Sequence, residues 1–318
     1  MIARSRALPL GVDLGSSRVR VAVPMEKADG SVRIAAVASR ETVTSGNALL
    51  PALLEEMLAE LGTRERRCVI SVGAPVAALR VVAFPRMTWT ERARAARFEA
   101  RRFAQWDIEA IPTHVRAHLV DGERGLYAVG AAQAKAIEMR RAVLREAGLQ
   151  AIAVDHDAFA LRRALPFADA IIDIGLERST LHAFDGLDVR SAHVPLGGAT
   201  VTRGIAGDLS IDAGSAERRK RILGSAGAGV DARDEVVHAL ATAIDRIRPR
   251  STITRVALTG NGSRLPGLAA SLEAASGAIV EMPVAQGFPA DVYPPDVVRS
   301  AAPDWTLAIA LATWARES

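Results

Sequence analysis

The chain has 318 residues, of which 49% are hydrophobic and 24% are charged, a balance typical of a folded globular protein. This composition excludes a disordered, collagen-like or coiled-coil chain, and the single cysteine, Cys68, excludes a disulfide framework or a cysteine-rich metal centre. The net charge of +4 permits an anionic partner without identifying one.

Two short segments, about half a chain apart, resemble each other. Residues 10–23 and 170–184 each consist of an apolar strand, an Asp-x-Gly turn and a second strand. Each segment predicts a β-hairpin with a tight turn. Two such openings at the heads of two halves favour a pair of related α/β lobes.

Periodicity, caps and breakers predict the remaining elements in chain order. The first half is expected to contain a strand near 32–37, a helix over 48–61, a strand over 68–72, a helix over 91–106, strands over 115–120 and 126–129, and a helix over 133–147. The second half is expected to contain helices over 197–209, 216–223 and 234–247, a strand over 255–259, and helices over 267–276 and 304–316. Thr88 or Thr90 is a candidate cap for the helix over 91–106, and Asp304 for the last helix.

No membrane span is expected. The longest apolar stretch near the end, 305–315, is about half of the ~20 residues that a spanning helix needs. Pro9 and Gly11 interrupt the first apolar residues, so no signal peptide is expected either.

The turn after the first strand carries residue types suited to phosphate and metal. Asp13 is followed by Gly15, Ser16 and Ser17. Glycine lets the backbone approach a phosphate, hydroxyl and amide groups donate to its oxygens, and an aspartate can hold Mg²⁺ through water. Taken alone, an Asp-Gly hairpin is more often only a turn.

A second turn of the same type changes that balance. Asp173 and Gly175 repeat the pattern, and Thr180 supplies a hydroxyl on the following strand. If the two lobes face each other, these two turns grip one phosphate chain from both sides. The pair therefore predicts a phosphate site between the lobes.

Two further segments of the second half could complete a nucleotide site. Gly260, Asn261 and Gly262 follow a strand, where bare backbone could accept a nucleobase or ribose, although an ordinary strand-to-helix turn is an equal alternative. Glu217 and Lys220 share one face of a predicted helix, and lysine is otherwise nearly absent from the chain. A solvated ion pair is the alternative for that pair.

In this order and spacing, the four segments resemble the first phosphate loop, second phosphate loop, ribose helix and adenosine loop of the actin-like ATPase superfamily. Residues 194–206 look like the Pro-x-Gly-Gly-x-x-Ile-Thr stretch of the FtsA and PilM branch, and residues 84–87 resemble the opening of the PilM subdomain. Residues 147–151 and 304–312 also look PilM-like. The resemblance to PilM-like type IV pilus assembly proteins covers nearly the whole chain.

This resemblance implies an α/β, actin-like fold of duplicated RNase H-like lobes. The first lobe would span 1–166, with a small inserted α+β subdomain at about 74–130, and the second lobe would span 167–318. The cofactors implied are ATP and Mg²⁺, with Asp13 and Asp173 on the metal side. The nucleotide-binding residues implied are Asp13, Gly15, Ser16, Ser17, Arg20, Asp173, Gly175, Thr180, Glu217, Lys220, Gly260, Asn261 and Gly262.

The resemblance also implies a role. PilM-like proteins are cytoplasmic scaffolds of type IV pilus assembly that bind ATP and the cytoplasmic tail of a single-span membrane protein, PilN, beside the inserted subdomain. We therefore expect a cytoplasmic protein recruited to the inner membrane through such a partner, with no nucleic-acid partner. Self-association of the chain stays open.

Some features depart from the superfamily pattern. No general base can be assigned, and Glu177 stands in the second phosphate turn where a small residue is usual. Its carboxylate either repels a terminal phosphate or turns outward. ATP hydrolysis is therefore expected to be slow or absent. Three alternatives stay open. One is a cell-division protein of the FtsA type, which would normally carry an amphipathic tail. The second is the cytoplasmic part of a related type II secretion protein, which would normally continue into a membrane span. The third is a small-molecule kinase of the same superfamily.

Overall fold

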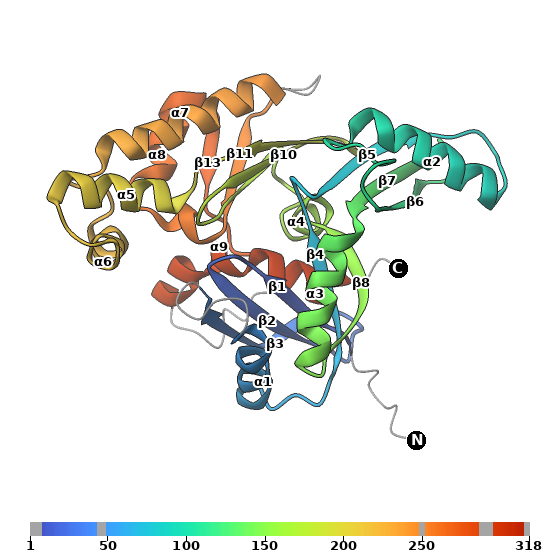
Figure 1. Ribbon diagram of the computed structural model, residues 1–318, viewed down its shortest axis with the longest axis horizontal. Coiled ribbons are helices and arrows are strands. Elements are labelled where there is room, and N and C mark those ends of the chain that lie inside the picture. The colour runs from blue at the N-terminus through green and yellow to red at the C-terminus, as the bar shows by residue number, and fades with distance from the viewer. Residues whose placement is uncertain (1–7, 43–48, 248–251, 286–294, 315–318) are drawn as a thin grey trace.

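The computed structural model describes residues 8–42, 49–247, 252–285 and 295–314. Two five-stranded sheets, one three-stranded sheet and the helices packed on them form an α/β structure (Figure 1). The first sheet lies at the bottom of Figure 1, the second at the upper left, and the small sheet at the upper right.

The first sheet has the strand order β3-β2-β1-β4-β8. Its strands are β1 (Leu10–Leu14), β2 (Arg18–Glu26), β3 (Val32–Glu41), β4 (Arg67–Val72) and β8 (Gln150–His156). The first three strands are antiparallel, and β4 and β8 add in parallel. The helices α1 (Leu50–Glu60) and α3 (Ala134–Glu146) supply leucines to the core of this lobe.

The second sheet repeats this topology in the order β11-β10-β9-β12-β13. Its strands are β9 (Ala170–Ile174), β10 (Ser179–Asp185), β11 (Asp188–Val194), β12 (Arg255–Thr259) and β13 (Ile279–Glu281). The accompanying helices are α5 (Gly198–Leu209), α6 (Ala213–Leu223), α7 (Val230–Ile247), η2 (Asn261–Arg264) and α8 (Leu268–Ser276). Again a three-strand antiparallel meander is followed by parallel strands, so the two halves are related α/β lobes.

A separate small sheet forms between β4 and β8 along the chain. It consists of β5 (Ala77–Ala83), β6 (Thr113–Asp121) and β7 (Leu126–Gln133) in the order β5-β7-β6, covered by α2 (Trp89–Phe103). Of the two candidate caps, Thr88 is the one used. Its hydroxyl accepts a hydrogen bond from the Glu91 amide, and the Glu91 carboxylate accepts one from the Thr88 amide at 2.8 Å.

Two helices join the lobes. The helices α4 (Asp157–Ala164) and α9 (Pro295–Ala312) pack against each other, and one apolar core cluster contains residues from both large sheets and from both helices. In Figure 1, α9 is the red helix between the two lobes. No helix in the described ranges is long and apolar enough to cross a membrane.

The last helix differs from its sequence-based prediction. It begins at Pro295 and passes through Pro303, so Asp304 lies inside the helix and does not cap it. The Pro-Asp pair is a typical helix start, but here the Asp304 carboxylate turns toward Arg20 and Arg264. The predicted end of this helix, Arg316, lies outside the described residues.

Gly11 is the point of closest approach between β1 and α9. A Cβ at this position would lie 2.9 Å from the Ala312 Cβ and closer still to the backbone of Ala308 and Ala312. The bare Cα therefore lets the helix cross directly over the strand.

We expect Gly11→Ala to lower the free energy of unfolding by about 1–3 kcal/mol, because the added methyl group overpacks this contact. Gly207→Ala is the matched control. Gly207 lies in α5 with open space around it, so alanine should stabilise by about 0.5–1 kcal/mol. Urea unfolding measures both changes, and equal effects of the two variants would contradict the close contact.

Candidate functional site

Arg20 lies at the centre of the interface between the two lobes. It stands opposite Asp13 in the β1–β2 register, and its Nη1 donates to Asp13 Oδ2 at 3.2 Å. Its Nη2 donates to Asn261 Oδ1 of the second lobe and lies 3.8 Å from Asp304 Oδ2 on α9. The side chain is only 6% exposed. One buried guanidinium thus connects both lobes and the helix between them.

Other contacts also join the two lobes. Asn261 Nδ2 donates to Ser17 Oγ at 3.3 Å, so the Gly260–Gly262 segment touches the turn after β1 directly. Farther out, Arg221 on α6 pairs with Glu41 at the end of β3 at 2.9 Å. The Trp305 ring lies 6.0 Å from the Arg20 guanidinium carbon, within the range of a cation–π contact. Polar contacts at Ser17, Arg20 and Glu41 therefore connect the first lobe to the second lobe and to α9.

Three carboxylates, those of Asp13, Asp157 and Asp173, lie near enough for their charges to affect one another's pKa. Burial raises the pKa of Asp13, with Arg20 opposing the rise and Asp157 adding to it. Burial, together with the charges of Asp13 and Asp157, raises the pKa of Asp173 to about 7. Several buried carboxylates close together favour the binding of a cation.

Glu217 and Lys220 form a second cluster, behind the turn between β9 and β10. Lys220 Nζ contacts Glu217 at 2.6 Å, the Gly198 carbonyl at 2.9 Å and Thr202 Oγ1 at 2.8 Å. Burial lowers the pKa of Lys220. Against the opposing effect of burial, hydrogen bonds from Lys220 and Thr202 lower the pKa of Glu217 to about 2. The pair thus joins a buried Lys220 to a half-buried Glu217. Neither side chain could turn toward a ligand without losing these partners.

The glycines of the two second-lobe turns have packing reasons. A Cβ on Gly175 would lie 2.9 Å from the Arg178 carbonyl oxygen. The Gly175 carbonyl also accepts a hydrogen bond from the Gly198 amide at 3.0 Å, which ties the turn to the start of α5. A Cβ on Gly260, which has a φ of 79°, would lie 2.7 Å from the Ile174 carbonyl, and one on Gly262 would lie 3.0 Å from it. The backbone of η2 therefore packs directly on β9, beside Asp173.

Glu177 turns outward. Its side chain is 61% exposed and lies 3.4 Å from Arg203 on α5. The sequence left two expectations for this residue: repulsion of a terminal phosphate, or an outward orientation. The structure shows the outward orientation.

The predicted metal ligands are the carboxylates of Asp13 and Asp173. No three His, Cys, Asp or Glu side chains are arranged as a metal site anywhere in the described part of the chain. Asp13 and Asp173 nevertheless fit Mg²⁺, which typically takes one or two carboxylates and fills its shell with water and phosphate oxygens. The pKa values of both carboxyls are raised because burial penalises their negative charge, and a bound cation would offset this penalty. At Asp13, the ion pair with Arg20 already offsets part of it.

Most of the predicted site residues come together in space. Contacts link Asp13, Ser17 and Arg20 to the Gly260–Gly262 segment, which packs beside Asp173, and Thr180 stands opposite Asp173 in the sheet register. In the first turn, Gly15 packs on the Arg18 carbonyl and Ser16 is exposed. The Lys220 cluster contacts the second turn from behind through Gly198.

Two residues of this site were missed from the sequence. Asp157 begins α4, a helix that no periodicity signal predicted, and Asp304 was interpreted as a cap. One signal could have predicted this helix start: Asp157 is an acidic residue that follows an apolar strand, and acidic residues are common in the first turn of a helix.

Comparison with solved structures identifies the architecture. The chain matches a chain of the PilM–PilN type IV pilus biogenesis complex with a TM-score of 0.81 and 25% sequence identity, covering 98% of this chain and 100% of that one. The fold is actin-like. The predicted likeness to PilM is confirmed.

More distant structures share the fold alone. The ethanolamine utilization protein EutJ from Carboxydothermus hydrogenoformans matches with a TM-score of 0.60 and 15% identity, covering 96% of this chain and 90% of EutJ. A diol dehydratase-reactivating factor in nucleotide-free form matches with a TM-score of 0.59 and 11% identity, covering 98% of this chain and 100% of the factor. No family model matches the sequence, and no curated protein matches it.

We expect Arg20→Met to lower the free energy of unfolding by about 3–5 kcal/mol, because it leaves Asp13 and Asp304 buried without their shared cation. Arg116→Met is the control, since Arg116 is an exposed residue of β6 far from the lobes. Urea unfolding at pH 7 measures both. A loss below about 1 kcal/mol for Arg20→Met would contradict its role as the bridge between the lobes.

Asp173 should make stability depend on pH. Because its pKa is raised to about 7 in the folded chain, the folded state holds the proton more tightly than the unfolded state. The stabilisation is complete below about pH 4 and is lost as the pH rises toward 7, by up to about 4 kcal/mol. Asp173→Asn should remove this slope in unfolding free energies measured between pH 4.5 and 7.5.

Asp169→Asn is the control, because the pKa of Asp169 is shifted in the direction opposite to that of Asp173. Hydrogen bonds from Thr254 and Arg255 outweigh burial and lower the pKa of Asp169, so its contribution is present throughout pH 4.5–7.5. This variant should lose stability evenly and keep the slope. The same slope in wild type and in Asp173→Asn would refute the assignment.

Proposed function

We propose that this chain is a nucleotide-binding scaffold of a type IV pilus, or related secretion, assembly complex at the inner membrane. The observation that carries the proposal is the match, over the full length of both chains, to a chain of the PilM–PilN type IV pilus biogenesis complex. The match includes the inserted sheet β5-β7-β6 as well as the two lobes, since it covers 98% of the chain.

The proposed ligand of the cleft is ATP with Mg²⁺. Support comes from the meeting of two Asp-x-Gly turns, from Ser17 and Arg20 as donors to phosphate oxygens, and from the unbalanced charge of Asp13 and Asp173. When bound, Mg²⁺ would neutralise phosphate charge beside these two carboxylates. The helix α6 with Glu217 and Lys220, and the loop with Gly260 and Asn261, would line the nucleoside side.

Coupling to a partner would run through the contacts that close the cleft. A phosphate chain entering between the turns must take donors from their present partners, and Arg20 is bonded to Asn261 across the lobes. Nucleotide would therefore replace lobe-to-lobe contacts with lobe-to-phosphate contacts. A change in lobe separation would follow, which is the kind of two-state element that can bias partner binding.

Turnover of ATP is proposed to be slow or absent. Proton transfer from an attacking water needs a base positioned on the substrate. Arg20 already holds Asp13, and the raised pKa of Asp173 leaves that carboxyl partly protonated near pH 7. Asp157 and Asp304 are further carboxylates in this region. The proposed part of Asp157 is to add to the local charge, and Asp304 is held by Arg264.

The proposed partner is the cytoplasmic tail of a single-span membrane protein of the PilN type, bound beside the inserted subdomain. In this proposal the chain is cytoplasmic and reaches the inner membrane through that partner. Co-expression with such a membrane protein tests this directly. The chain should co-purify with the intact partner and not with a version that lacks its cytoplasmic tail, and co-purification with neither would overturn the proposal.

For the nucleotide, two acidic residues of the phosphate turns form a matched pair. We expect Asp13→Asn to weaken Mg²⁺-dependent ATP binding by about tenfold or more, which corresponds to roughly 1.4 kcal/mol. Glu177→Gln should leave the affinity within about twofold, because its side chain faces outward against Arg203. Isothermal titration calorimetry gives both values. No ATP binding by the wild-type chain would reject the nucleotide part of the proposal.

A further inference from the structure

The helix α2 carries a large share of the positive charge of the chain. Its 15 residues include five arginines and two glutamates, a net charge of +3, against +4 for the whole chain. A helix with this surplus of arginine favours an anionic surface or partner. Which of the two it suits depends on how the charged and apolar side chains are distributed around the helix.

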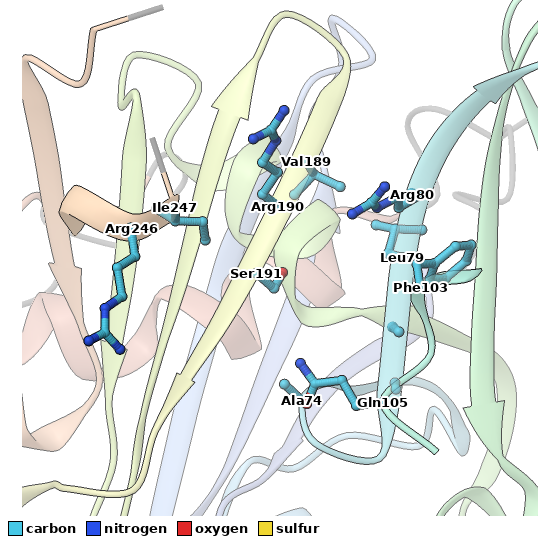
Figure 2. A pocket seen from close by; sticks show the side chains of 12 residues that line it. Ala74, Leu79, Arg80, Phe103, Gln105, Val189, Arg190, Ser191, Arg246 and Ile247 are labelled. Atoms are coloured by element: carbon cyan, nitrogen blue, oxygen red, sulfur yellow. The ribbon is translucent and has the colours of Figure 1, made fainter. Parts of the chain in front are cut away.

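The helix covers one face of the small sheet. Its buried residues are Ala96 and Ala100, and Ala100 shares an apolar cluster with Ala131 of β7. The other face of the sheet packs against the second lobe, where Leu79 of β5 and Val189 of β11 belong to one core cluster. Figure 2 shows these two residues at that junction, beside a cavity of about 280 Å³. The side of α2 opposite Ala96 and Ala100, called its outer side below, is therefore the free surface of the inserted subdomain, at the upper right of Figure 1.

Phe98 lies at the centre of the outer side of α2. It is two positions from each of the buried residues Ala96 and Ala100, which places it on roughly the opposite side of the helix. Its side chain is 60% exposed. The ring therefore adds little to the core of the subdomain and is accessible to a ligand.

Arginines surround this ring. Arg94 and Arg102 lie one helical turn before and after Phe98, and Arg101 lies three positions after it. All three arginines are exposed, and Arg97 borders the same side. Long arginine side chains can lie along an apolar group while their guanidinium groups stay in a polar layer. The outer side of α2 thus combines one apolar ring with a ring of cationic groups.

The carboxylates near this side leave a surplus of positive charge. Three ion pairs are present: Glu109 with Arg97 at 3.2 Å, Glu109 with Arg101 at 2.7 Å, and Glu99 with Arg102 at 3.2 Å. The Glu91 carboxylate is bonded to Thr88 at 2.8 Å, and Arg94 has no acidic partner among the described residues. Exposed ion pairs are weak, so these arginines can exchange a carboxylate for another anion.

A bilayer with anionic headgroups suits this combination. Guanidinium groups bind phosphate oxygens through two parallel hydrogen bonds, and helices that lie at a membrane interface typically carry arginine together with aromatic residues. A single-stranded nucleic acid would need successive rings for stacking, whereas this side has one. The side of a helix is convex, so it offers an acidic peptide no groove.

We propose that the outer side of α2 binds the surface of a bilayer that contains anionic phospholipids. Arg94, Arg101 and Arg102 bind headgroup phosphates, and Phe98 enters between the headgroups. The binding is weak and reversible, because stable attachment takes a second signal. This goes beyond the proposed function, since the contact needs neither nucleotide nor a membrane-protein partner.

Binding of the full chain to vesicles tests the proposal. One vesicle preparation contains equal parts of phosphatidylcholine and phosphatidylglycerol, the other contains phosphatidylcholine alone, and co-sedimentation gives the bound fraction. We expect binding to the mixed vesicles to be stronger by about tenfold or more. Raising the salt from about 0.1 M to about 0.5 M should remove most of this difference, because it screens the arginines.

A pair of arginine variants locates the charged part of the contact. Arg94→Gln should lower binding to the mixed vesicles about fivefold, because it removes a charge next to the headgroups. Arg116→Gln is the control. Arg116 is exposed on β6 and stands opposite Gly130, as Leu79 does, so its side chain lies on the face of the small sheet away from α2. This variant should keep binding within about twofold.

A pair of aromatic variants locates the apolar part. Phe98→Ser should lower binding to the mixed vesicles about fivefold, because the ring no longer enters the interface. Phe98→Trp should keep binding, since tryptophan is also typical of membrane interfaces. Trp89→Ser is the control. Trp89 is 72% exposed on the same helix, but its position places it on the opposite side of the helix from Phe98, so its loss should have no effect.

Four results would overturn the inference. They are no preference for the mixed vesicles, equal losses in Arg94→Gln and Arg116→Gln, equal losses in Phe98→Ser and Trp89→Ser, and tighter binding of polyglutamate or of a single-stranded oligonucleotide than of the vesicles. The last result indicates a partner of another class. A chain that binds a PilN-type tail but not the vesicles refutes only this inference, and one that binds the vesicles but no tail refutes only the proposed partner.

Discussion

The arrangement of the two lobes depends on one buried charge. Arg20 reaches from the second strand of the first lobe to Asn261 of the second lobe and to Asp304 of the helix between them. The two terminal nitrogens of this buried guanidinium contact acceptors, while its Nε has no hydrogen-bond partner among the described residues, so loss of either contact would leave more of the charge uncompensated. The interface is therefore held by polar geometry as well as by apolar packing, and a ligand that offers better acceptors can rearrange it.

The apolar part of the same interface explains why those partners are in reach. Gly11 lets α9 cross over β1 without a side chain between them, and the core cluster of α4 and α9 extends into both sheets. This close crossing brings Asp304 and Trp305 to Arg20. Asp157, the first residue of α4, lies in the same region. The proposed nucleotide site and the contacts between the lobes thus share one set of residues.

Local patterns predicted much of this from the sequence. The repeated Asp-x-Gly hairpins predicted two related lobes, because strand, turn and strand are encoded within about fifteen residues. The helix α4 and the strands β5 and β8 were not predicted, since each is short and lacks a distinct period. Asp304 was misassigned because a Pro-Asp pair is a good helix start, whereas its actual partner, Arg20, is far away in the sequence. Pairings such as Arg20 with Asn261 depend on how the lobes dock, which no local pattern encodes.

We propose that the contact region around Arg20 is the nucleotide site of a PilM-like scaffold. A crystal structure of the chain with Mg²⁺ and a non-hydrolysable ATP analogue at saturating concentration tests this most directly. We expect phosphate density between the turns at Gly15 and Gly175, with the Arg20 guanidinium moved from Asn261 to a phosphate oxygen. A structure with no nucleotide between these turns and Arg20 still bonded to Asn261 would contradict the proposal.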